Sequence, residues 1–173
     1  LRDPRIHFDT KTRFYGISRD NALFQGRVLK KNTSEKKEIV ADRAVRLLSV
    51  VPTIKLIGIS GSLAQLSASD SDDIDLFIIV KKNTVWMTRF TCVIILKVFG
   101  MYRREGNYKD KICLNMIIDS YAFPLERQDL YNAFEIAQLR PKMSRDNSYE
   151  SFVLSNAWMI KFLPNFEHYS AKK

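Results

Sequence analysis

The sequence predicts an α/β fold, because three strand-like runs alternate along the chain with segments of helical periodicity. The runs cover residues 54–60, 73–80 and 111–118, and each is rich in β-branched or other apolar residues. A chain of 173 residues, of which 46% are hydrophobic and 27% charged, is long enough to bury one core. These values exclude a disordered tail, a collagen-like repeat and a disulfide-rich miniprotein.

The first 33 residues are basic and rich in turn residues, and we expect an appendage or the remnant of a preceding domain there. Within this region, the segments RFYGI and ALFQGRV predict a short hairpin. Residues 34–173 then form the main domain. Ser34 is the predicted N-cap of a helix that Pro52 ends. The apolar residues of this helix recur on one face, at Val40, Ala44, Leu47, Leu48 and Val51.

Helical segments are expected between the strands and after them. Gly61 ends the first strand, and Ser62 opens one or two helical turns in LAQLSAS. The second strand is apolar on both faces after its first turn, so we expect it to be buried. The apolar segment 85–99 predicts a buried helix, and helices near 129–140 and 148–163 close the chain. Three large side chains of the 85–99 helix are expected in the core: Trp86, Phe90 and Ile94.

The charge balance favours an anionic partner. The chain has 28 Lys and Arg residues against 19 Asp and Glu residues, which gives a net charge of +9. The first fifty residues carry twelve basic and six acidic side chains, so most of the excess lies there. A basic surface of this kind attracts nucleotides, RNA, DNA or anionic lipid.

The cysteines and the apolar segments bear on the compartment. Cys92 and Cys113 both lie inside apolar runs, which favours buried thiols in a reducing compartment. The first ten residues lack the apolar core of a signal peptide, and no uncharged apolar run approaches the roughly 18 residues of a membrane span. We therefore expect a cytoplasmic protein with no membrane partner.

The segment ISGSLAQLSASDSDDIDLFIIV carries the chemistry. Gly61 lets the backbone turn tightly and approach a ligand, and Ser62 opens a short helix whose free N–H groups attract phosphate oxygens. Asp73 and Asp75 lie two residues apart on a strand and therefore share a face. Two neighbouring carboxylates repel unless a hard cation lies between them, and Mg²⁺ takes such oxygen ligands while leaving room for phosphates. The segment therefore predicts phosphoryl or nucleotidyl transfer.

Gly61-Ser62, ten intervening residues and then Asp73-x-Asp75 resemble the signature of the nucleotidyltransferase superfamily typified by DNA polymerase beta. The spacing is similar to that of minimal and antibiotic nucleotidyltransferases, and the whole chain resembles uncharacterised bacterial nucleotidyltransferase-domain proteins. The resemblance implies a mixed β-sheet with flanking helices and two Mg²⁺ ions held by the aspartates. It also implies transfer of a nucleoside monophosphate from an NTP, with release of pyrophosphate.

The resemblance also implies a third carboxylate on a later strand. In KICLNMIID, alternation places Asn115 and Asp119 on one face, and Asn115 stands where that acid is expected. Asn115 cannot bear the charge, so Asp119 is the candidate third catalytic acid, or the acceptor brings its own nucleophile, or the second metal site is weakened. Lys109 and Lys111 are the candidates for binding the triphosphate.

Three functions stay open from the sequence. The first is an active Mg²⁺-dependent nucleotidyltransferase that modifies a hydroxyl of an unknown small molecule or protein. The second is a catalytically weak nucleotide-binding or regulatory module. In the third, the basic N-terminal region binds nucleic acid, and the nucleotidyltransferase acts on that nucleic acid.

Overall fold

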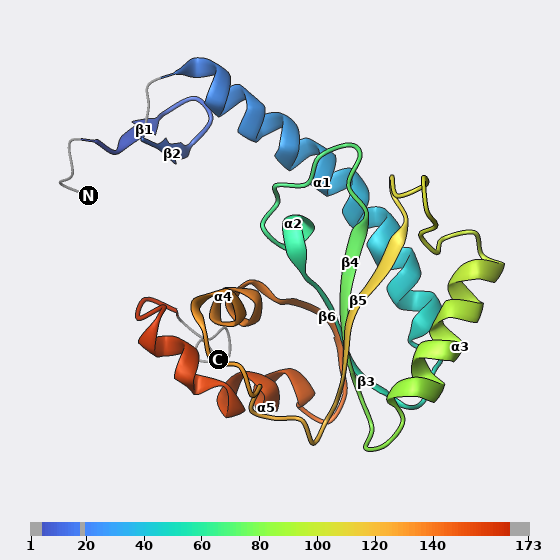
Figure 1. Cartoon of the computed structure of the whole chain (residues 1–173). Helices are drawn as coiled ribbons and strands as arrows, with labels where there is room; N and C mark the ends of the chain where they lie inside the picture. The colour runs from blue at the N-terminus through green and yellow to red at the C-terminus, as the bar shows by residue number, and fades with distance from the viewer. Residues whose placement is uncertain (1–4, 18–19, 167–173) are drawn as a thin grey trace.

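A four-stranded mixed β-sheet forms the centre of the computed structural model, which describes residues 5–17 and 20–166 (Figure 1). The sheet has the order β5-β4-β3-β6. Its strands are β3 (Ile54–Ile59), β4 (Ile74–Val80), β5 (Ile112–Asp119) and β6 (Arg140–Ser144). β3 pairs antiparallel with β4 and β6, whereas β4 and β5 run parallel.

Helices cover both faces of this sheet, which confirms the predicted α/β fold with a mixed sheet and flanking helices (Figure 1). One face carries α1 (Asn21–Leu48) and α3 (Val85–Val98). The other carries α4 (Leu130–Gln138), α5 (Ser148–Ser155) and the 3₁₀ helix η1 (Ala157–Lys161). Within the described ranges, none of the helices combines the length with the apolarity that crossing a membrane requires.

Alternation along the strands divides the core into two layers. On β4, Leu76 and Ile78 pack in the layer under α1 and α3, while Phe77 and Ile79 pack under α4 and α5. All four side chains are buried, as the apolar pattern of this strand predicts. The sheet is therefore covered on both sides, and polar side chains meet at the end where β4 begins.

The start of α1 differs from the prediction. The helix begins at Asn21, where Asp20 caps it by accepting a hydrogen bond from the Ala22 backbone N–H. The prediction of Ser34 as an N-cap is therefore wrong. Ser34 is buried in mid-helix, where its hydroxyl donates to the Lys30 carbonyl and accepts from the Ala68 N–H. The hydroxyl thus joins α1 to the segment before β4.

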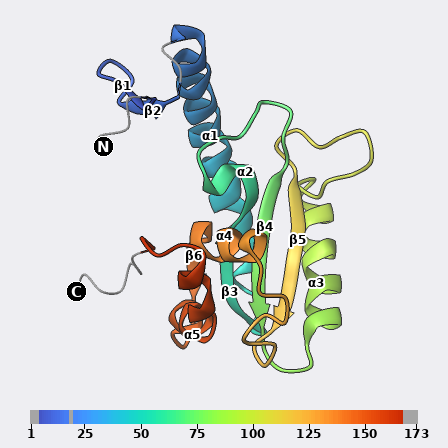
Figure 2. The same ribbon diagram turned by 60° about the vertical axis from the view of Figure 1, so that its left-hand side comes forward.

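The predicted hairpin is half right. RFYGI contributes β2 (Phe14–Gly16), but its partner is β1 (His7–Asp9), because ALFQGRV lies inside α1. Figure 2 shows this hairpin beside the first turns of α1, away from the sheet. The division of the chain near residue 33 stays a prediction, and α1 runs continuously through that position.

The structure differs from the sequence-based prediction at one further strand and on one helix. Strand β6 was not foreseen, because RPKMS contains a proline and two cations, which are typical of an edge strand. The prediction that Trp86, Phe90 and Ile94 lie in the core is wrong, because all three are exposed on the outer side of α3. Only every fourth residue of this helix faces the sheet fully, at Thr88, Cys92 and Leu96.

A buried lysine ties α1 to the loops at the beginning of β4 and β5. Lys37 is 1% exposed, and its Nζ donates to the carbonyl oxygens of Asp70 and Asp72 at 3.1 and 2.7 Å. The same Nζ forms an ion pair with Asp110 Oδ1 at 2.7 Å. Burying an ammonium group is costly unless its hydrogen bonds are satisfied, and here three oxygens satisfy it.

Replacement of Lys37 by methionine is expected to lower the free energy of unfolding by about 2–4 kcal/mol, because two carbonyls and a carboxylate lose their donor. Urea denaturation measures this change. Lys36→Met is the matched control, since Lys36 is the exposed neighbour on the same helix and its loss should change stability by about 0.5 kcal/mol or less. Equal effects of the two substitutions would contradict a structural role for Lys37.

Candidate functional site

The turn after β3 lies directly against the carboxylate of Asp75. Gly61 begins the one-turn helix α2 (Gly61–Ala64) with φ of +63°, a conformation that L side chains rarely adopt. A Cβ at Gly61 would lie 2.5 Å from Asp75 Oδ2. The Ser60 N–H donates to the Asp75 carbonyl at 3.0 Å and holds the turn against β4. Only glycine fits this contact without displacement of the carboxylate.

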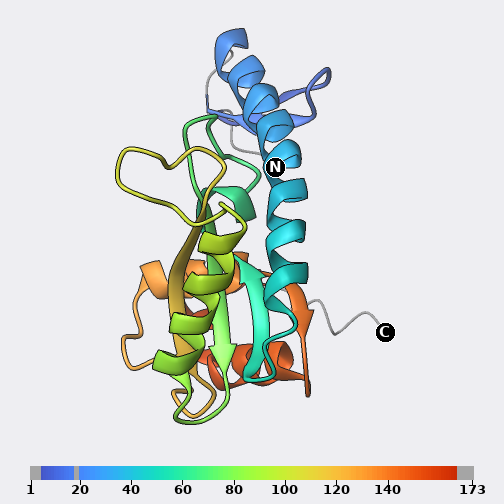
Figure 3. The ribbon, with the colours of Figure 1, turned by 90° about the vertical axis from the view of Figure 1, so that its right-hand side faces the viewer.

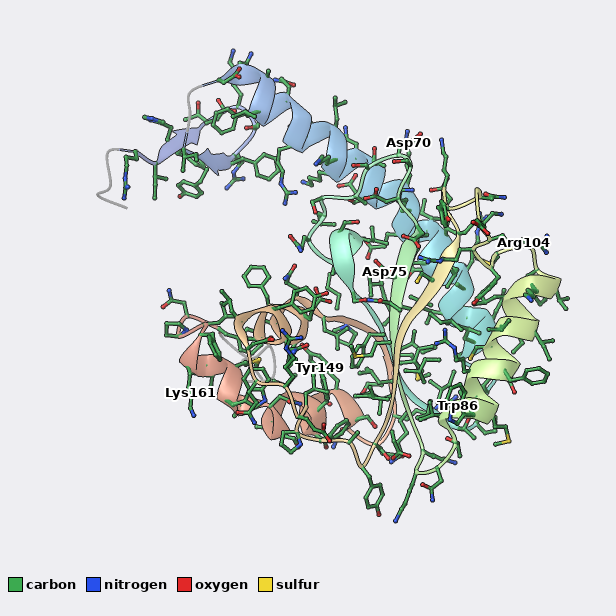
Figure 4. The ribbon with its side chains drawn as sticks, viewed as in Figure 1. Asp70, Asp75, Trp86, Arg104, Tyr149 and Lys161 are labelled. Atoms are coloured by element: carbon green, nitrogen blue, oxygen red, sulfur yellow. The ribbon has the colours of Figure 1, made fainter. Side chains whose placement is uncertain are left out.

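Asp73, Asp75 and Cys113 form a cluster at the beginning of β4 and β5. One ligand atom from each of the three side chains lies within 4.8 Å of the others. Asp73 immediately precedes β4, and Cys113 is the partner of Asp75 in the parallel register. Figure 4 shows Asp75 between β4 and α2. The structure thus brings the two predicted aspartates together with the predicted glycine turn and adds a thiol.

Arg103 neutralises part of the cluster's charge. Its Nη1 donates to Asp73 Oδ2 at 2.6 Å and to Cys113 Sγ at 3.3 Å. The guanidinium also lies over the Tyr108 ring, 5.5 Å from its centroid. Arg103 comes from the loop that joins α3 to β5, so this loop contributes a cation to a cluster otherwise built from the strands.

Burial changes the protonation of the cluster. Burial first, and the charge of Asp73 second, raise the pKa of the Asp75 carboxyl. Burial and the neighbouring Asp75 raise the pKa of Cys113 to about 11, so its thiol is protonated at neutral pH. A hydrogen bond joins this thiol to the Asp75 carboxyl. Two carboxylates suit a hard divalent cation, whereas a neutral thiol is not a ligand for Mg²⁺.

Ser62 is bonded within the site rather than directed to a ligand. Its hydroxyl donates to Asp72 Oδ2 at 3.0 Å, and the Ser69 N–H donates to the same oxygen at 2.9 Å. These bonds fix the loop between α2 and β4. Because α2 has a single turn, its dipole is small, and the backbone N–H groups of the turn are the donors that remain for a phosphate.

A cavity of about 350 Å³ lies beside Asp75. Its polar lining includes Arg89 and Arg103, which face it from α3 and the following loop, and Asn115. Arg89 Nη1 is held by the Leu114 carbonyl at 3.3 Å. A cavity with two guanidinium groups next to a carboxylate pair suits an anionic ligand that is bound together with a cation.

Asn115 occupies an irregularity in β5. The register with β4 shifts there, since Leu76 pairs with Leu114 and Phe77 with Met116. Asn115 is exposed and lines the cavity beside Asp75 as well as a small one that contains Glu135. The shift breaks the predicted alternation, because Leu114 packs in the layer under α1 and α3 whereas Met116, two residues later, packs under α4 and α5.

Glu135 on α4 is a carboxylate that the sequence reasoning missed. Burial first, and the charge of Asp75 second, raise the pKa of Glu135. The charge of Asp75 therefore acts on this carboxylate, and Asn115 lines both the cavity beside Asp75 and the small cavity beside Glu135. The only sequence signal was a single acid in an otherwise uncharged helix, and the position of that helix on the sheet was unknown.

The structure does not bring Asp119 to the cluster, so the expectation that it supplies the third acid is corrected. In the parallel register Asp119 pairs with Val80, six residues beyond the Asp75–Cys113 pair. Six residues of strand span about 20 Å. Its carboxylate instead accepts from the backbone N–H groups of Asn83 and Tyr121.

The two predicted lysines also have other partners. Lys109 forms an exposed ion pair with Asp70 at 2.6 Å. Lys111 donates to the Gly100 carbonyl at 2.7 Å and lines a separate cavity with Lys97 and Arg104. The cations beside the aspartates are therefore Arg89 and Arg103.

The chain is similar to a protein of known structure. No protein-family model matches the chain, and no curated protein matches it. A crystal structure at 1.40 Å of a "putative nucleotidyltransferase" from Sulfolobus solfataricus resembles it, with 19% sequence identity over 62% of this chain and 82% of that chain. The TM-score is 0.32, which is too low to identify a shared function.

Gly61→Ala is expected to lower the free energy of unfolding by roughly 2–4 kcal/mol, because it adds a clash with Asp75 to the strain of the left-handed conformation. Gly100→Ala is the matched control, since Gly100 has φ of +65° and no atom within 4 Å of an added Cβ. In Gly100→Ala, backbone strain alone should lower the free energy of unfolding by about 1–2 kcal/mol. Equal losses in chemical denaturation would show that the Asp75 contact contributes nothing.

Asp75→Asn is expected to raise the melting temperature at pH 7 in the presence of EDTA. A carboxyl with a raised pKa favours the folded state below the unfolded value of 3.8, and this stabilisation is lost as pH rises through the folded value. The uncharged amide removes the cost of burying a negative charge at neutral pH. The increase in melting temperature should therefore become smaller toward pH 4. Thermal melts across this pH range measure it.

Asp70→Asn should show the opposite sign, because the hydrogen bond and the charge of Lys109 lower the pKa of Asp70. Its charged form therefore stabilises the fold above pH 3.8. A decrease in melting temperature for Asp75→Asn at pH 7 would contradict the inferred cost of its buried charge.

Proposed function

We propose that this chain is a divalent-cation-dependent nucleotidyltransferase, which moves a nucleoside monophosphate from an NTP to a hydroxyl of a small molecule or protein and releases pyrophosphate. The observation that carries the proposal is the contact of the Gly61 turn with Asp75, whose carboxylate clusters with that of Asp73. A turn that exposes backbone N–H groups beside two carboxylates can hold a phosphate chain and its counter-cation together.

Asp73 and Asp75 are the residues that would hold Mg²⁺, and the donor set fits it through their oxygens. When bound, Mg²⁺ neutralises charge on the phosphates and aligns the attacking and leaving oxygens. Cys113 stabilises the buried Asp75 carboxylate by a hydrogen bond. The presence of two ions and the identity of the NTP stay predictions.

Arg89 and Arg103 bind the negative charge of the triphosphate in the adjoining cavity. Arg103 is half-exposed and contacts Asp73 at 2.6 Å, so it balances the aspartate's charge in the metal-free protein. Guanidinium groups bind phosphate oxygens in a bidentate manner and remain charged at any physiological pH. When a divalent cation binds Asp73, the guanidinium of Arg103 can therefore leave Asp73 and bind a phosphate instead.

Glu135 is the base in this proposal. The acceptor hydroxyl gives its proton to Glu135, its oxygen forms a bond to the α-phosphorus, and the bond to the leaving pyrophosphate breaks with its electron pair. Asn115 cannot accept that proton, but its amide can orient the acceptor beside the cavity. The raised pKa of Glu135 brings its basicity closer to neutral pH, where a general base is most effective.

The test is pyrophosphate release with Mg²⁺ and each of the four NTPs, with and without cell extract as a source of acceptor. Asp73→Asn and Asp75→Asn should each lower the rate by roughly 100-fold or more, because each removes a metal ligand. Glu135→Gln should lower kcat by roughly 100-fold and remove the acidic limb of the pH profile. Asp70→Asn, which changes an exposed acid outside the cluster, should leave the rate unchanged.

Release that persists in Asp75→Asn would contradict the proposal. No pyrophosphate release in any reaction, combined with thermal stabilisation by an NTP, would instead favour the catalytically weak nucleotide-binding module. Activity that is retained in Glu135→Gln but lost in both aspartate variants would exclude Glu135 as the base and would leave the role of the aspartates unchanged.

A further inference from the structure

The outer side of α3 carries a continuous row of large apolar side chains. We call this row the α3 stripe, and it consists of Trp86, Met87, Phe90, Ile94 and Val98. Their exposed fractions lie between 45% and 83%, whereas Thr88, Cys92 and Leu96 on the opposite side are buried. Spacings of four residues keep the stripe on one side of the helix over its whole length.

The stripe is large for an exposed apolar surface. Phe99, at the end of α3, extends it and is 59% exposed. Each of its aromatic side chains has about 150–250 Å² of surface, so the exposed part of the stripe amounts to several hundred Å². Apolar patches of this size mark sites where another molecule binds.

The segment that contains the stripe is basic, although the carboxylate of Asp119 lies at the start of α3, where it accepts from the Asn83 N–H. No acidic residue occurs between Asp75 and Glu105, and this interval includes all of α3. Six basic residues lie in the same interval, of which Arg89 and Arg103 line the cavity beside Asp75. The other four are exposed: Lys81, Lys82, Lys97 and Arg104. Figure 3 shows α1 beside α3 on the same face of the sheet, and α1 adds the exposed cations Arg43 and Arg46. The partner of this face is therefore expected to be anionic.

We propose that the α3 stripe docks on a lipid bilayer that contains anionic headgroups. Aromatic and branched side chains enter the region between headgroups and acyl chains, while Lys and Arg around them bind lipid phosphates. A second copy of this chain would bring two basic faces together, which disfavours that occupant. The sequence-based expectation of no membrane partner rested on the lack of a spanning segment, and surface docking needs none.

The experiment is co-sedimentation with vesicles of phosphatidylcholine alone or mixed with phosphatidylserine, at low and high salt. The wild type should sediment with the mixed vesicles at low salt, and binding should fall at high salt or without phosphatidylserine. Phe90→Glu should weaken binding about tenfold or more, because it places a carboxylate at the interface. Leu154→Glu is the matched control, since Leu154 is 71% exposed on α5 and outside the stripe.

A second readout is the fluorescence of Trp86 in a Trp158→Phe background, which leaves one tryptophan. Its emission should shift to shorter wavelength on the mixed vesicles. Absence of vesicle binding at low salt would overturn the proposal, as would equal binding by Phe90→Glu and the wild type. A wild-type dimer that Phe90→Glu dissociates, without lipid binding, would assign the stripe to a second copy of the chain and overturn it too.

Discussion

The buried ammonium group of Lys37 fixes the end of the sheet where the candidate site lies. It joins α1 to the carbonyls of Asp70 and Asp72 and to the carboxylate of Asp110. The chain enters β4 directly after the first loop and β5 directly after the second. The positions of the Asp73–Asp75 pair and of its strand neighbour Cys113 therefore depend on a cation that contacts none of them in the described structure.

This constraint explains how an unfavourable cluster of carboxylates is held together. Asp73 and Asp75 repel each other, and Asp75 is also partly buried, so the isolated cluster costs stability. Arg103, the thiol of Cys113 and the tight Gly61 turn offset part of that cost. Strain and charge repulsion kept in place by a rigid scaffold are typical of a binding or catalytic site.

Local patterns in the sequence predicted the parts of the site that lie on consecutive residues. The strand before the Gly61 turn and the common side of Asp73 and Asp75 depend on backbone geometry, and both are present. Parts that depend on packing were not predictable. The charge of Asp75 acts on Glu135 because α4 packs against the sheet, and Asp119 is remote because of the parallel register. Apolar periodicity cannot distinguish an inner from an outer face when both are apolar, and Phe90 was misplaced for that reason.

We propose that Asp73 and Asp75 hold a divalent cation together with a nucleotide. Electron paramagnetic resonance of free Mn²⁺, with a non-hydrolysable NTP analogue present, measures this binding directly. We expect the wild type to deplete free Mn²⁺, and we expect the folded Asp75→Asn variant not to do so. Equal Mn²⁺ binding by the two proteins would contradict it.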